Sequence, residues 1–540
     1  MYNRFYLAAA AVAAITAFPL AATPALAAGA TAAPAVAVSA GPALRLADIE
    51  VAPGVVLKAN VYTPAGADAE NPAPLVILPT SWGLPQIEYL VQARKLAEKG
   101  FVALSYTPRG FYGSGDRIGV AGADDVADIS KVIDWALAET PSDGGRIGTA
   151  GVSYGAGLGL LGAAFDARIK AVVALSGWGD LAESLYGGGT QHLMAAGLLD
   201  VAARLTGRPS PELTGMLDEF YKGDDIPKVM DWAALRSPAT YVDRINANGT
   251  AVMISNAWGD SIFPPNQVGE FFDRLTGPKL LEMRPGDHAT TEGLGLVGLP
   301  NDAWDDTHAW LERHLRGAGN GIDAKGPVLV QPKLQDGYES YPSWSALTGS
   351  ELTLGLGDEN LLRTGRLSGD AGTGWRTTIS ADIDSGASAG IIMISPTLEQ
   401  LAELPPTVAL AGVKRAHAGV WKTGRLTEKR ELRGTAKLRV TVTPTAAEGT
   451  LFAYLYDVNV LGVAKLITHT PYGFEGKQAG KPFAADVTFQ GTAYDVPAGH
   501  RLALVVDTVD AMYKENNPAF AKVTFSSPAG DPARLTLPLR

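Results

Sequence analysis

The sequence predicts an α/β domain that is interrupted by a helical cap and followed by an antiparallel β-sandwich. Short apolar runs alternate with helical stretches from residue 46 to about 317, the alternation stops between residues 181 and 249, and the hydrophobic period changes to two from about residue 351. Alternating strands and helices form a parallel sheet covered on both faces, whereas period-two strands separated by Gly and Pro form sandwiches. A chain of 540 residues has room for all three parts.

The first part of the α/β domain comprises residues 46–180. Its predicted strands are residues 74–78, 101–106, 146–152 and 169–176, and its predicted helices are residues 89–99, 124–138 and 154–165. The cap, residues 181–249, has predicted helices at 193–205, 211–221 and 226–235. The second part of the α/β domain, residues 250–317, has predicted strands at 250–256 and 279–283 and a closing helix at 304–315. These segments follow the hydrophobic periods of strands and helices.

A linker is predicted over residues 318–350 and the β-sandwich over residues 351–540. Apolar and polar residues alternate cleanly at 437–442, 451–456 and 501–506, and helical pattern is nearly absent from this part. Such alternation is typical of strands with one buried face.

The first 27 residues have the pattern of a secretory signal peptide. Arg4 is followed by a long apolar stretch that Pro19 interrupts, and Ala25-Leu26-Ala27 fits a small-residue cleavage site. An uncleaved membrane anchor is the alternative, although Pro19 and the small residues fit cleavage better. We expect a secreted or periplasmic protein without stable membrane insertion after cleavage, and a flexible leader over residues 28–45.

The composition excludes several classes of protein. Because the chain has no cysteine, it has no thiolate nucleophile, no disulfide and no Cys-ligated metal. A formal net charge of −11 disfavours a nucleic-acid partner. The sequence contains no phosphate-cradling or dinucleotide fingerprint, so we expect neither a cofactor nor a metal. It does not indicate an oligomeric state.

Residues 151–155, Gly-Val-Ser-Tyr-Gly, match the G-x-S-x-G pattern of a nucleophile elbow. The pattern alone is weak in a glycine-rich chain, but here it lies between a predicted strand and a predicted helix. An ordinary turn with a capping serine is the alternative. We expect Ser153 to be the nucleophile of an α/β-hydrolase fold.

A serine nucleophile needs a base, and the base needs an orienting acid. In this fold the acid and then the histidine follow the serine along the chain. His288 lies in a loop directly after a predicted strand, whereas His308 and His314 lie inside a predicted helix. We therefore expect His288 to be the base.

Asp260 is the expected acid because it directly follows the strand at 250–256. Asp287 is the rival, but adjacent residues rarely face each other well enough for a side-chain hydrogen bond. The oxyanion hole is expected to use the backbone N–H of Tyr154 and a second donor from residues 79–83, after the strand at 74–78.

With these motifs the chain resembles peptidase family S15, which joins Xaa-Pro dipeptidyl-peptidases with cocaine-esterase and α-amino-acid ester hydrolase acylases. The resemblance covers about residues 46–540. It rests on the elbow and on residues 109–115, 124–135, 455–458 and 497–502. Asp260 and His288 match the acid and the base of the family. The resemblance implies a jelly-roll topology for the C-terminal domain, which in this family shields the active site and packs on the catalytic domain.

The resemblance also bears on two tryptophans. The related esterases donate a tyrosine hydroxyl to the oxyanion from a position that is Trp82 here, so its indole N–H or a backbone amide would have to substitute. Trp178 follows the strand at 169–176 and is expected to line the substrate site. A tryptophan that packs the core or the cap is the alternative.

The expected function is that of an exported serine hydrolase acting through an acyl-enzyme. An Xaa-Pro dipeptidyl-peptidase is the first hypothesis, and an acyl ester or amide hydrolase on small acyl substrates is the alternative. A dipeptidyl-peptidase must bind a free ammonium group, for which the cap offers Asp200, Glu212, Asp218, Glu219, Asp224 and Asp225. Solvated helix faces also explain these acids. A hypothesis of another class is a non-catalytic protein whose β-sandwich binds a carbohydrate or a peptide.

Overall fold

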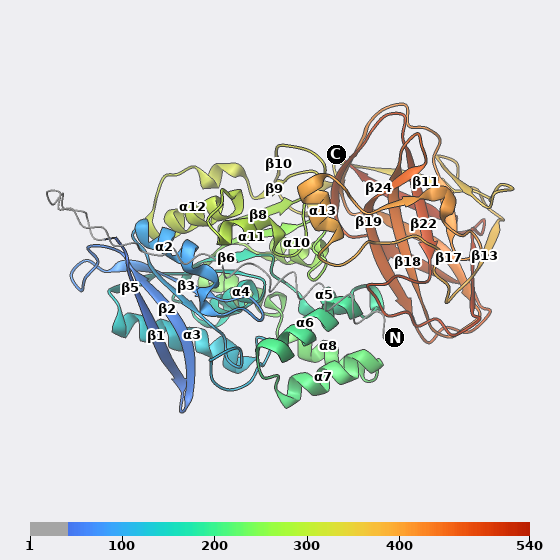
Figure 1. Cartoon of the computed structure of the whole chain (residues 1–540). Coiled ribbons are helices and arrows are strands. Elements are labelled where there is room, and N and C mark those ends of the chain that lie inside the picture. Colours follow the sequence, from blue (N-terminus) through green and yellow to red (C-terminus); the bar gives the residue numbers. More distant parts are fainter. Residues whose placement is uncertain (1–40) are drawn as a thin grey trace, which may run out of the picture.

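The computed structural model describes residues 41–540. It consists of an α/β domain and a C-terminal β-domain that lie side by side (Figure 1). The predicted signal peptide and most of the predicted leader fall outside the described residues. No helix within residues 41–540 has both the length and the apolar character needed to cross a membrane.

The α/β domain is built on a 10-stranded sheet within the described residues. In spatial order its strands are β1 (Ala43–Ala52), β2 (Val55–Thr63), β4 (Val102–Tyr106), β3 (Ala73–Pro79), β5 (Ser142–Val152), β6 (Ile169–Leu175), β7 (Ala251–Ala257), β8 (Lys279–Arg284), β9 (Val328–Val330) and β10 (Glu339–Tyr341). The run from β4 to β9 is parallel, as predicted, whereas β1, β2 and β10 pair antiparallel at the edges.

Two groups of helices cover the two faces of this sheet. On one face lie α2 (Leu90–Glu98), α11 (Thr290–Leu296) and α12 (Asp302–Arg316), and on the other lie α3 (Ala123–Glu139), α4 (Tyr154–Phe165), α9 (Val242–Asn248) and α10 (Pro265–Arg274). Successive residues of the central strands alternate between the two cores, for example Val76 and Ile77 of β3. Both faces are therefore buried.

The helical segment after β6 forms a layer beside the carboxyl ends of the strands. Its first four α-helices are α5 (Leu181–Tyr186), α6 (Leu193–Thr206), α7 (Pro211–Lys222) and α8 (Ile226–Ala234), drawn in green in Figure 1. Ser210 caps α7 by accepting the N–H of Leu213, with Pro211 at the first helical position, which is a common helix start.

Two predictions about connecting segments need correction. The leader was expected to run to residue 45, but β1 begins at Ala43 because its backbone pairs with Thr63 on β2. The predicted linker at 318–350 is not free of regular structure, since it contains β9 and β10, and β9 extends the sheet by pairing with β8.

The C-terminal domain contains a 14-stranded arrangement within the described residues. Its strands are β11 (Ser350–Leu356), β12 (Gly365–Ser368), β13 (Arg376–Ser380), β14 (Thr407–Ala409), β15 (Gly419–Lys422), β16 (Arg430–Gly434), β17 (Lys437–Pro444), β18 (Gly449–Val458), β19 (Val463–Phe474), β20 (Phe483–Thr488), β21 (Thr492–Val496), β22 (Arg501–Asp507), β23 (Lys522–Ser526) and β24 (Arg534–Leu539). They form two layers around a common hydrophobic core. The predicted fold class, an α/β domain followed by a β-sandwich, is confirmed.

The sandwich differs from its prediction in two details. Strands β12 and β15 pair parallel over residues 365–366 and 421–422, although the remaining pairs in this domain are antiparallel. The loop between β13 and β14 also contains a helix, α13 (Ser395–Ala402), where the sequence shows little helical pattern. In Figure 1, α13 lies at the boundary between the domains, next to α10 and α11.

Candidate active site

Ser153 occupies a strained turn between β5 and α4. Its backbone is left-handed, with φ +55° and ψ −114°, which few non-glycine residues adopt. Two glycines make the turn possible: a Cβ on Gly151 would lie 2.5 Å from the carbonyl carbon of Gly155, and a Cβ on Gly155 would overlap the carbonyl oxygen of Pro79. The serine side chain is thereby presented at the carboxyl end of the sheet.

The three residues that the sequence selects as a triad lie together. His288 Nε2 is 2.8 Å from Ser153 Oγ, and His288 Nδ1 is 3.1 Å from Asp260 Oδ2. The other oxygen of Asp260 accepts the N–H groups of Ile262 at 3.0 Å and Phe263 at 2.7 Å. These bonds fix the carboxylate, which in turn fixes the imidazole.

The environment of His288 favours the cationic form of its ring, with both nitrogens protonated. Burial lowers the pKa of His288, but the charge and hydrogen bond of Asp260, with smaller contributions from Glu292 and Asp287, outweigh it and raise the pKa above its usual value. The site therefore stabilises the imidazolium that forms when the ring accepts the serine proton.

Asp287, the rival acid, has a different partner. Its Oδ1 accepts the N–H of Ser261 at 2.8 Å and the hydroxyl of Ser261 at 2.6 Å. The same oxygen accepts the backbone N–H of His288 and makes no hydrogen bond to the imidazole ring. Burial and the nearby Asp260 raise the pKa of Asp287 to about 7. Asp287 thus ties the loop of Asp260 to the loop of His288.

The two expected oxyanion donors differ in their surroundings. Tyr154 is the first residue of α4, where a backbone N–H has no partner within the helix. The indole N–H of Trp82 donates to the carbonyl of Leu199 in the cap at 2.9 Å, so of the two alternatives for Trp82 the indole already has another partner and the backbone amide remains. Among residues 41–540 the backbone N–H groups of Trp82 and Gly83 both make no hydrogen bond, so either of them is free to act as the second donor from this loop.

A buried carboxyl group supports the oxyanion loop, and the sequence contained no signal for it. Glu88 accepts the N–H of Ser81 at 2.8 Å and lies 2.6 Å from its hydroxyl, which is also 3.1 Å from the carbonyl of Val152. The hydroxyl of Tyr89 accepts the N–H of Val152 at 2.9 Å. The N–H and the carbonyl of Val152, the residue before Ser153, are therefore bound by the hydroxyls of Tyr89 and Ser81, respectively.

An apolar cavity of about 80 Å³ opens beside Ser153. Its walls come from the elbow, the oxyanion loop and the cap, and include Trp82, Tyr154, Trp178, Leu199, Leu217 and Phe263. A small apolar acyl group is the kind of substrate part that such a pocket binds.

Trp178 lines this cavity and also packs the cap, so both sequence interpretations describe it. Its ring stacks on Tyr154 with centroids 6.2 Å apart, and its indole N–H donates to the carbonyl of Arg236 at 2.8 Å. A Cβ on Gly157 would overlap the ring, which explains a glycine in the middle of α4.

Asp200 is the acidic residue of the cap that lines the cavity. It also pairs with Arg204 of the same helix, at 2.8 Å. Of the other acids considered for an ammonium group, Glu212 pairs with Arg236 and Glu219 with Lys228. No group of His, Asp and Glu side chains in residues 41–540 is arranged to hold a metal ion.

A serine on a strained elbow, a buried histidine and a fixed carboxylate define a serine hydrolase of the α/β-hydrolase fold, rather than a non-catalytic binding protein. The comparisons agree. Residues 53–290 match the family model described as X-Pro dipeptidyl-peptidase (S15 family), and residues 320–529 match its C-terminal non-catalytic domain. The chain belongs to the peptidase S15 family.

Relatives share limited identity with this chain. A putative serine esterase of Mycobacterium bovis is 22% identical over 248 residues, which is 43% of this chain and 37% of the relative. The match thus spans little more than a third of that protein.

Solved structures share the fold over nearly the whole chain. A CocE/NonD family hydrolase from Staphylococcus aureus has a TM-score of 0.69 at 13% identity, covering 92% of this chain and 94% of the other. An α-amino acid ester hydrolase has a TM-score of 0.68 at 14% identity, covering 94% and 98%. An aminopeptidase of a Thaumarchaeota archaeon has a TM-score of 0.68 at 13% identity, covering 96% and 98%.

Proposed function

We propose that this protein hydrolyses esters or amides of small apolar carboxylic acids through an acyl-enzyme on Ser153. The observation that carries the proposal is the apolar cavity that opens directly beside the Ser153 side chain. The acyl part of the substrate fills this cavity, and its carbonyl carbon lies against Ser153 Oγ.

In the acylation step, Ser153 Oγ attacks the carbonyl carbon while its proton moves to His288 Nε2 across the 2.8 Å contact. The negative oxygen of the tetrahedral intermediate is held by the N–H of Tyr154 and that of Trp82 or Gly83. The intermediate collapses, the bond to the leaving group breaks, and His288 gives the proton to the leaving oxygen or nitrogen. A water molecule then repeats both steps on the acyl-serine and frees the acid.

Asp260 acts through His288. Its hydrogen bond to Nδ1 holds the ring tautomer that presents a free Nε2 to the serine, and its charge stabilises the imidazolium. Removing one oxyanion donor typically costs about 2.7–4 kcal/mol of transition-state stabilisation, so the two N–H groups carry a large part of the rate.

An Xaa-Pro dipeptidyl-peptidase is the second candidate, and Asp200 is the observation that favours it. A free N-terminal ammonium group would need a carboxylate near the far end of the acyl pocket, and Asp200 lines that pocket. We rank it second because Asp200 already has Arg204 as a charge partner, and the rest of the lining is apolar. Burying an ammonium group without a full partner is costly.

Activity on matched substrates separates the two. The purified protein is assayed on p-nitrophenyl esters of short aliphatic and aromatic acids and on a Gly-Pro p-nitroanilide, with Ser153→Ala as the control. The proposal expects ester turnover that Ser153→Ala abolishes, together with a fluorophosphonate label on Ser153. Turnover confined to the Gly-Pro anilide supports the second candidate, and turnover that survives Ser153→Ala contradicts both.

We also propose that the protein is exported and that its signal peptide is cleaved. The support is the apolar stretch after Arg4 and the Ala25-Leu26-Ala27 site. N-terminal sequencing of the protein from cell fractions tests this: a mature chain in the periplasm or medium that begins at Ala28 is expected, and an intact Met1 in the cytoplasm contradicts it.

A further inference from the structure

The C-terminal domain reaches the loops that carry the acid and the base through α13 and the turn before it. Pro396 lies against Gly259, the residue before Asp260, so closely that a Cβ on Gly259 would stand 2.6 Å from the Cβ of the proline. The N–H of Met393 donates to the hydroxyl of Ser261, the residue after Asp260, at 3.2 Å. Asp260 is thus flanked on both sides by contacts from the other domain.

The same helix contacts the loop of His288. The hydroxyl of Thr290 accepts the N–H of Asp287 at 2.8 Å, and its proton has two acceptors within reach, Oε1 of Gln400 at 2.6 Å and the carbonyl of Asp287 at 3.0 Å. A Cβ on Gly286 would lie 2.7 Å from Gln400 Oε1. The Gln400 side chain therefore fits a loop that has a glycine at the point of contact and a hydroxyl turned toward it.

A buried ion pair anchors α13 at this boundary. Glu399 Oε2 lies 3.0 Å from Lys333 Nζ, and both side chains are almost fully buried. The backbone N–H of Lys333 donates to the carbonyl of Ala493 at 2.8 Å, and its ammonium to that of Ile467 at 3.3 Å, both in the sandwich. Such a pair fixes a geometry strongly, because removing one member leaves a buried charge uncompensated.

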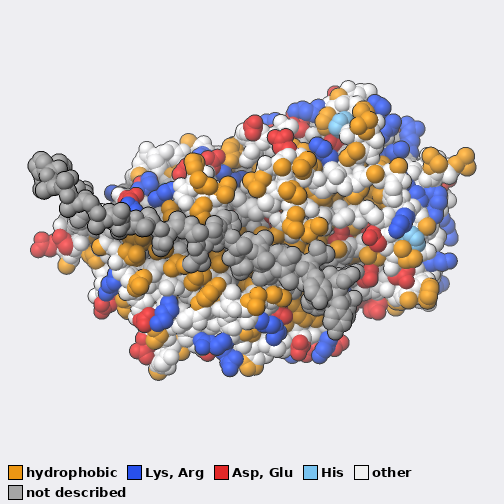
Figure 2. Space-filling model, viewed as in Figure 1, with side chains coloured by type: hydrophobic (Ala, Val, Ile, Leu, Met, Phe, Trp, Pro, Cys, Tyr) orange, Lys and Arg blue, Asp and Glu red, His pale blue; other side chains and the backbone are white. Residues whose placement is uncertain are grey.

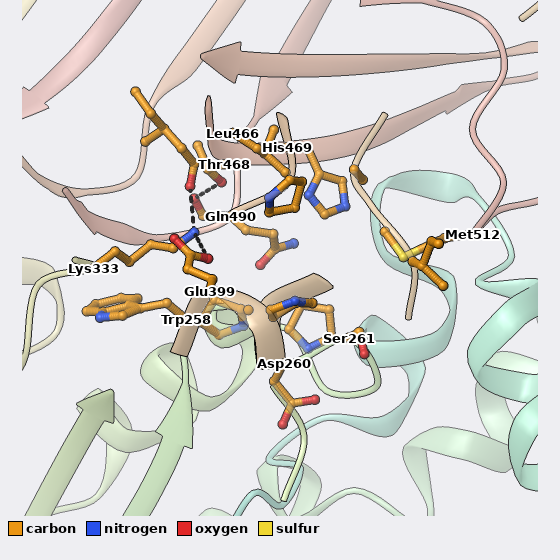
Figure 3. Close-up of a pocket in the computed structure, with 18 of the residues that line it drawn as sticks. Trp258, Asp260, Ser261, Lys333, Glu399, Leu466, Thr468, His469, Gln490 and Met512 are labelled. Carbon is orange, nitrogen blue, oxygen red and sulfur yellow. Dashed lines mark hydrogen bonds and ion pairs between the residues drawn. The ribbon is translucent and has the colours of Figure 1, made fainter. Parts of the chain in front are cut away.

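The ion pair lies at one end of a cavity of about 60 Å³ between the domains. Figure 3 shows Glu399 and Lys333 on one side of this cavity, Met512 on the opposite side, and Leu466 and His469 of the sandwich above it, while the carboxylate of Asp260 points away from it. The loop that carries Asp260 therefore borders a cavity on this side, and α13 is one of the elements that line it.

We propose that α13 is a positioning element of the active site, in which Gln400 holds the His288 loop and the Lys333–Glu399 pair holds the helix itself. The C-terminal domain then takes part in catalysis indirectly, by setting the distance between Asp260 and His288. This inference rests on the proposed role of the triad, and its test includes a readout that does not depend on turnover.

Gln400 offers a matched pair of substitutions. Gln400→Met keeps the length of the side chain and removes the acceptor for Thr290, whereas Gln400→Glu keeps an acceptor. Leu401→Ser is a control on the same helix, because Leu401 is 66% exposed. Exposed hydrophobic side chains are common on the face of the molecule that Figure 2 shows. We expect Gln400→Met to lower kcat about tenfold with KM within twofold, and the other two variants to stay within twofold of the wild type.

Two further readouts separate positioning from loss of stability. The acid limb of kcat/KM reports His288, which Asp260, Glu292 and Asp287 face. A looser contact with Asp260 moves this limb to lower pH in Gln400→Met, whereas a smaller folded fraction leaves it in place. The downfield proton resonance of His288 Nδ1–H, which requires the bond to Asp260, is expected to weaken in Gln400→Met and persist in Gln400→Glu.

The anchor is tested by a double substitution. Glu399→Gln leaves Lys333 without its charge partner and is expected to lower kcat as Gln400→Met does, while Glu399→Gln with Lys333→Met removes both charges and recovers part of the loss.

An unchanged kcat and an unchanged Nδ1–H resonance in Gln400→Met overturn the inference. An inactive wild type that still shows the resonance and its loss in Gln400→Met supports the inference and counts against the proposed function alone.

Discussion

The carboxyl group of Glu88 lies 2.8 Å from the N–H of Ser81 and 2.6 Å from its hydroxyl. That hydroxyl is also 3.1 Å from the carbonyl of Val152, the residue before Ser153. A hydroxyl has one proton, so it satisfies both oxygens only when Glu88 is protonated and donates to it. Burial raises the pKa of Glu88 to about 7, which makes the protonated form abundant at neutral pH.

Removing this group is expected to loosen the oxyanion loop. Glu88→Ala leaves the N–H and the hydroxyl of Ser81 without their partner, and we expect kcat on a short acyl ester to fall roughly tenfold to a hundredfold, less than or equal to the loss of one oxyanion donor. Glu88→Gln keeps a neutral group that can both donate and accept, and it should stay within about threefold of the wild type. Equal activities of Glu88→Ala and the wild type would show that the loop does not need this support.

The buried contact between Glu88 and Ser81 also predicts that the stability difference between the wild type and Glu88→Gln depends on pH. The carboxyl of Glu88 ionises near 4.5 when unfolded and near 7 when folded, so between these values the unfolded state binds fewer protons than the folded state. The free energy of unfolding of the wild type, relative to Glu88→Gln, should therefore be greatest below pH 4.5, fall up to pH 7, and level off above it. Urea unfolding of both proteins across this range measures the difference, and a constant difference contradicts the assignment.

The pH dependence of activity is expected to follow His288. The ring must be neutral to accept the proton of Ser153, so kcat/KM rises with pH through the pKa of His288, which lies above its usual value of 6.5. Asp260→Asn removes the main influence that raises this pKa. The acid limb should then move to lower pH, and kcat should fall by about 10⁴-fold. A limb that stays in place would mean that another group controls it.

The three residues of the proposed triad were predictable from the sequence as neighbours because their signals are local. The glycines around Ser153 mark a strained turn between a strand and a helix, and the prediction of a helix at 154–165 coincides with α4. Asp260 and His288 each follow a buried strand, and parallel strands bring their carboxyl ends to one edge of the sheet. Chain order and strand ends were sufficient to select all three.

The surroundings of the site were not predictable in this way. The indole of Trp82 is bonded to the carbonyl of Leu199, 117 residues further along the chain, and no periodicity records such a contact. In the sequence, Glu88 is an acidic residue near the start of a predicted helix, where acids are usually exposed. In the fold it is buried against Ser81. Helix α13 has weak local pattern and forms where the sandwich meets the α/β domain. Each depends on tertiary packing rather than on local sequence.

Two helical glycines are expected to respond in opposite directions to the same substitution. In Gly157→Ala the new methyl group overlaps the ring of Trp178, which a hydrogen bond to the carbonyl of Arg236 holds in place, so we expect a loss of about 1–3 kcal/mol in the free energy of unfolding. In Gly215→Ala, inside α7, the Cβ meets open space and the helix gains about 0.5–1 kcal/mol. Urea or thermal unfolding measures both. A stable Gly157→Ala protein would mean that Trp178 moves freely.

The cavity beside Ser153 is expected to set the length of the acyl group. Leu199 of α6 lines this cavity, and Leu199→Ala enlarges it without touching the triad. The ratio of kcat/KM for an octanoyl over a butanoyl p-nitrophenyl ester should rise by about tenfold. The reason is that each additional methylene bound in an apolar pocket contributes at most about 1–3 kcal/mol to transition-state binding. Leu205→Ala is the matched control, since Leu205 lies on the same helix, 69% exposed. If both variants shift the ratio equally, or neither does, the acyl group binds elsewhere, and the assignment of this cavity to the substrate fails.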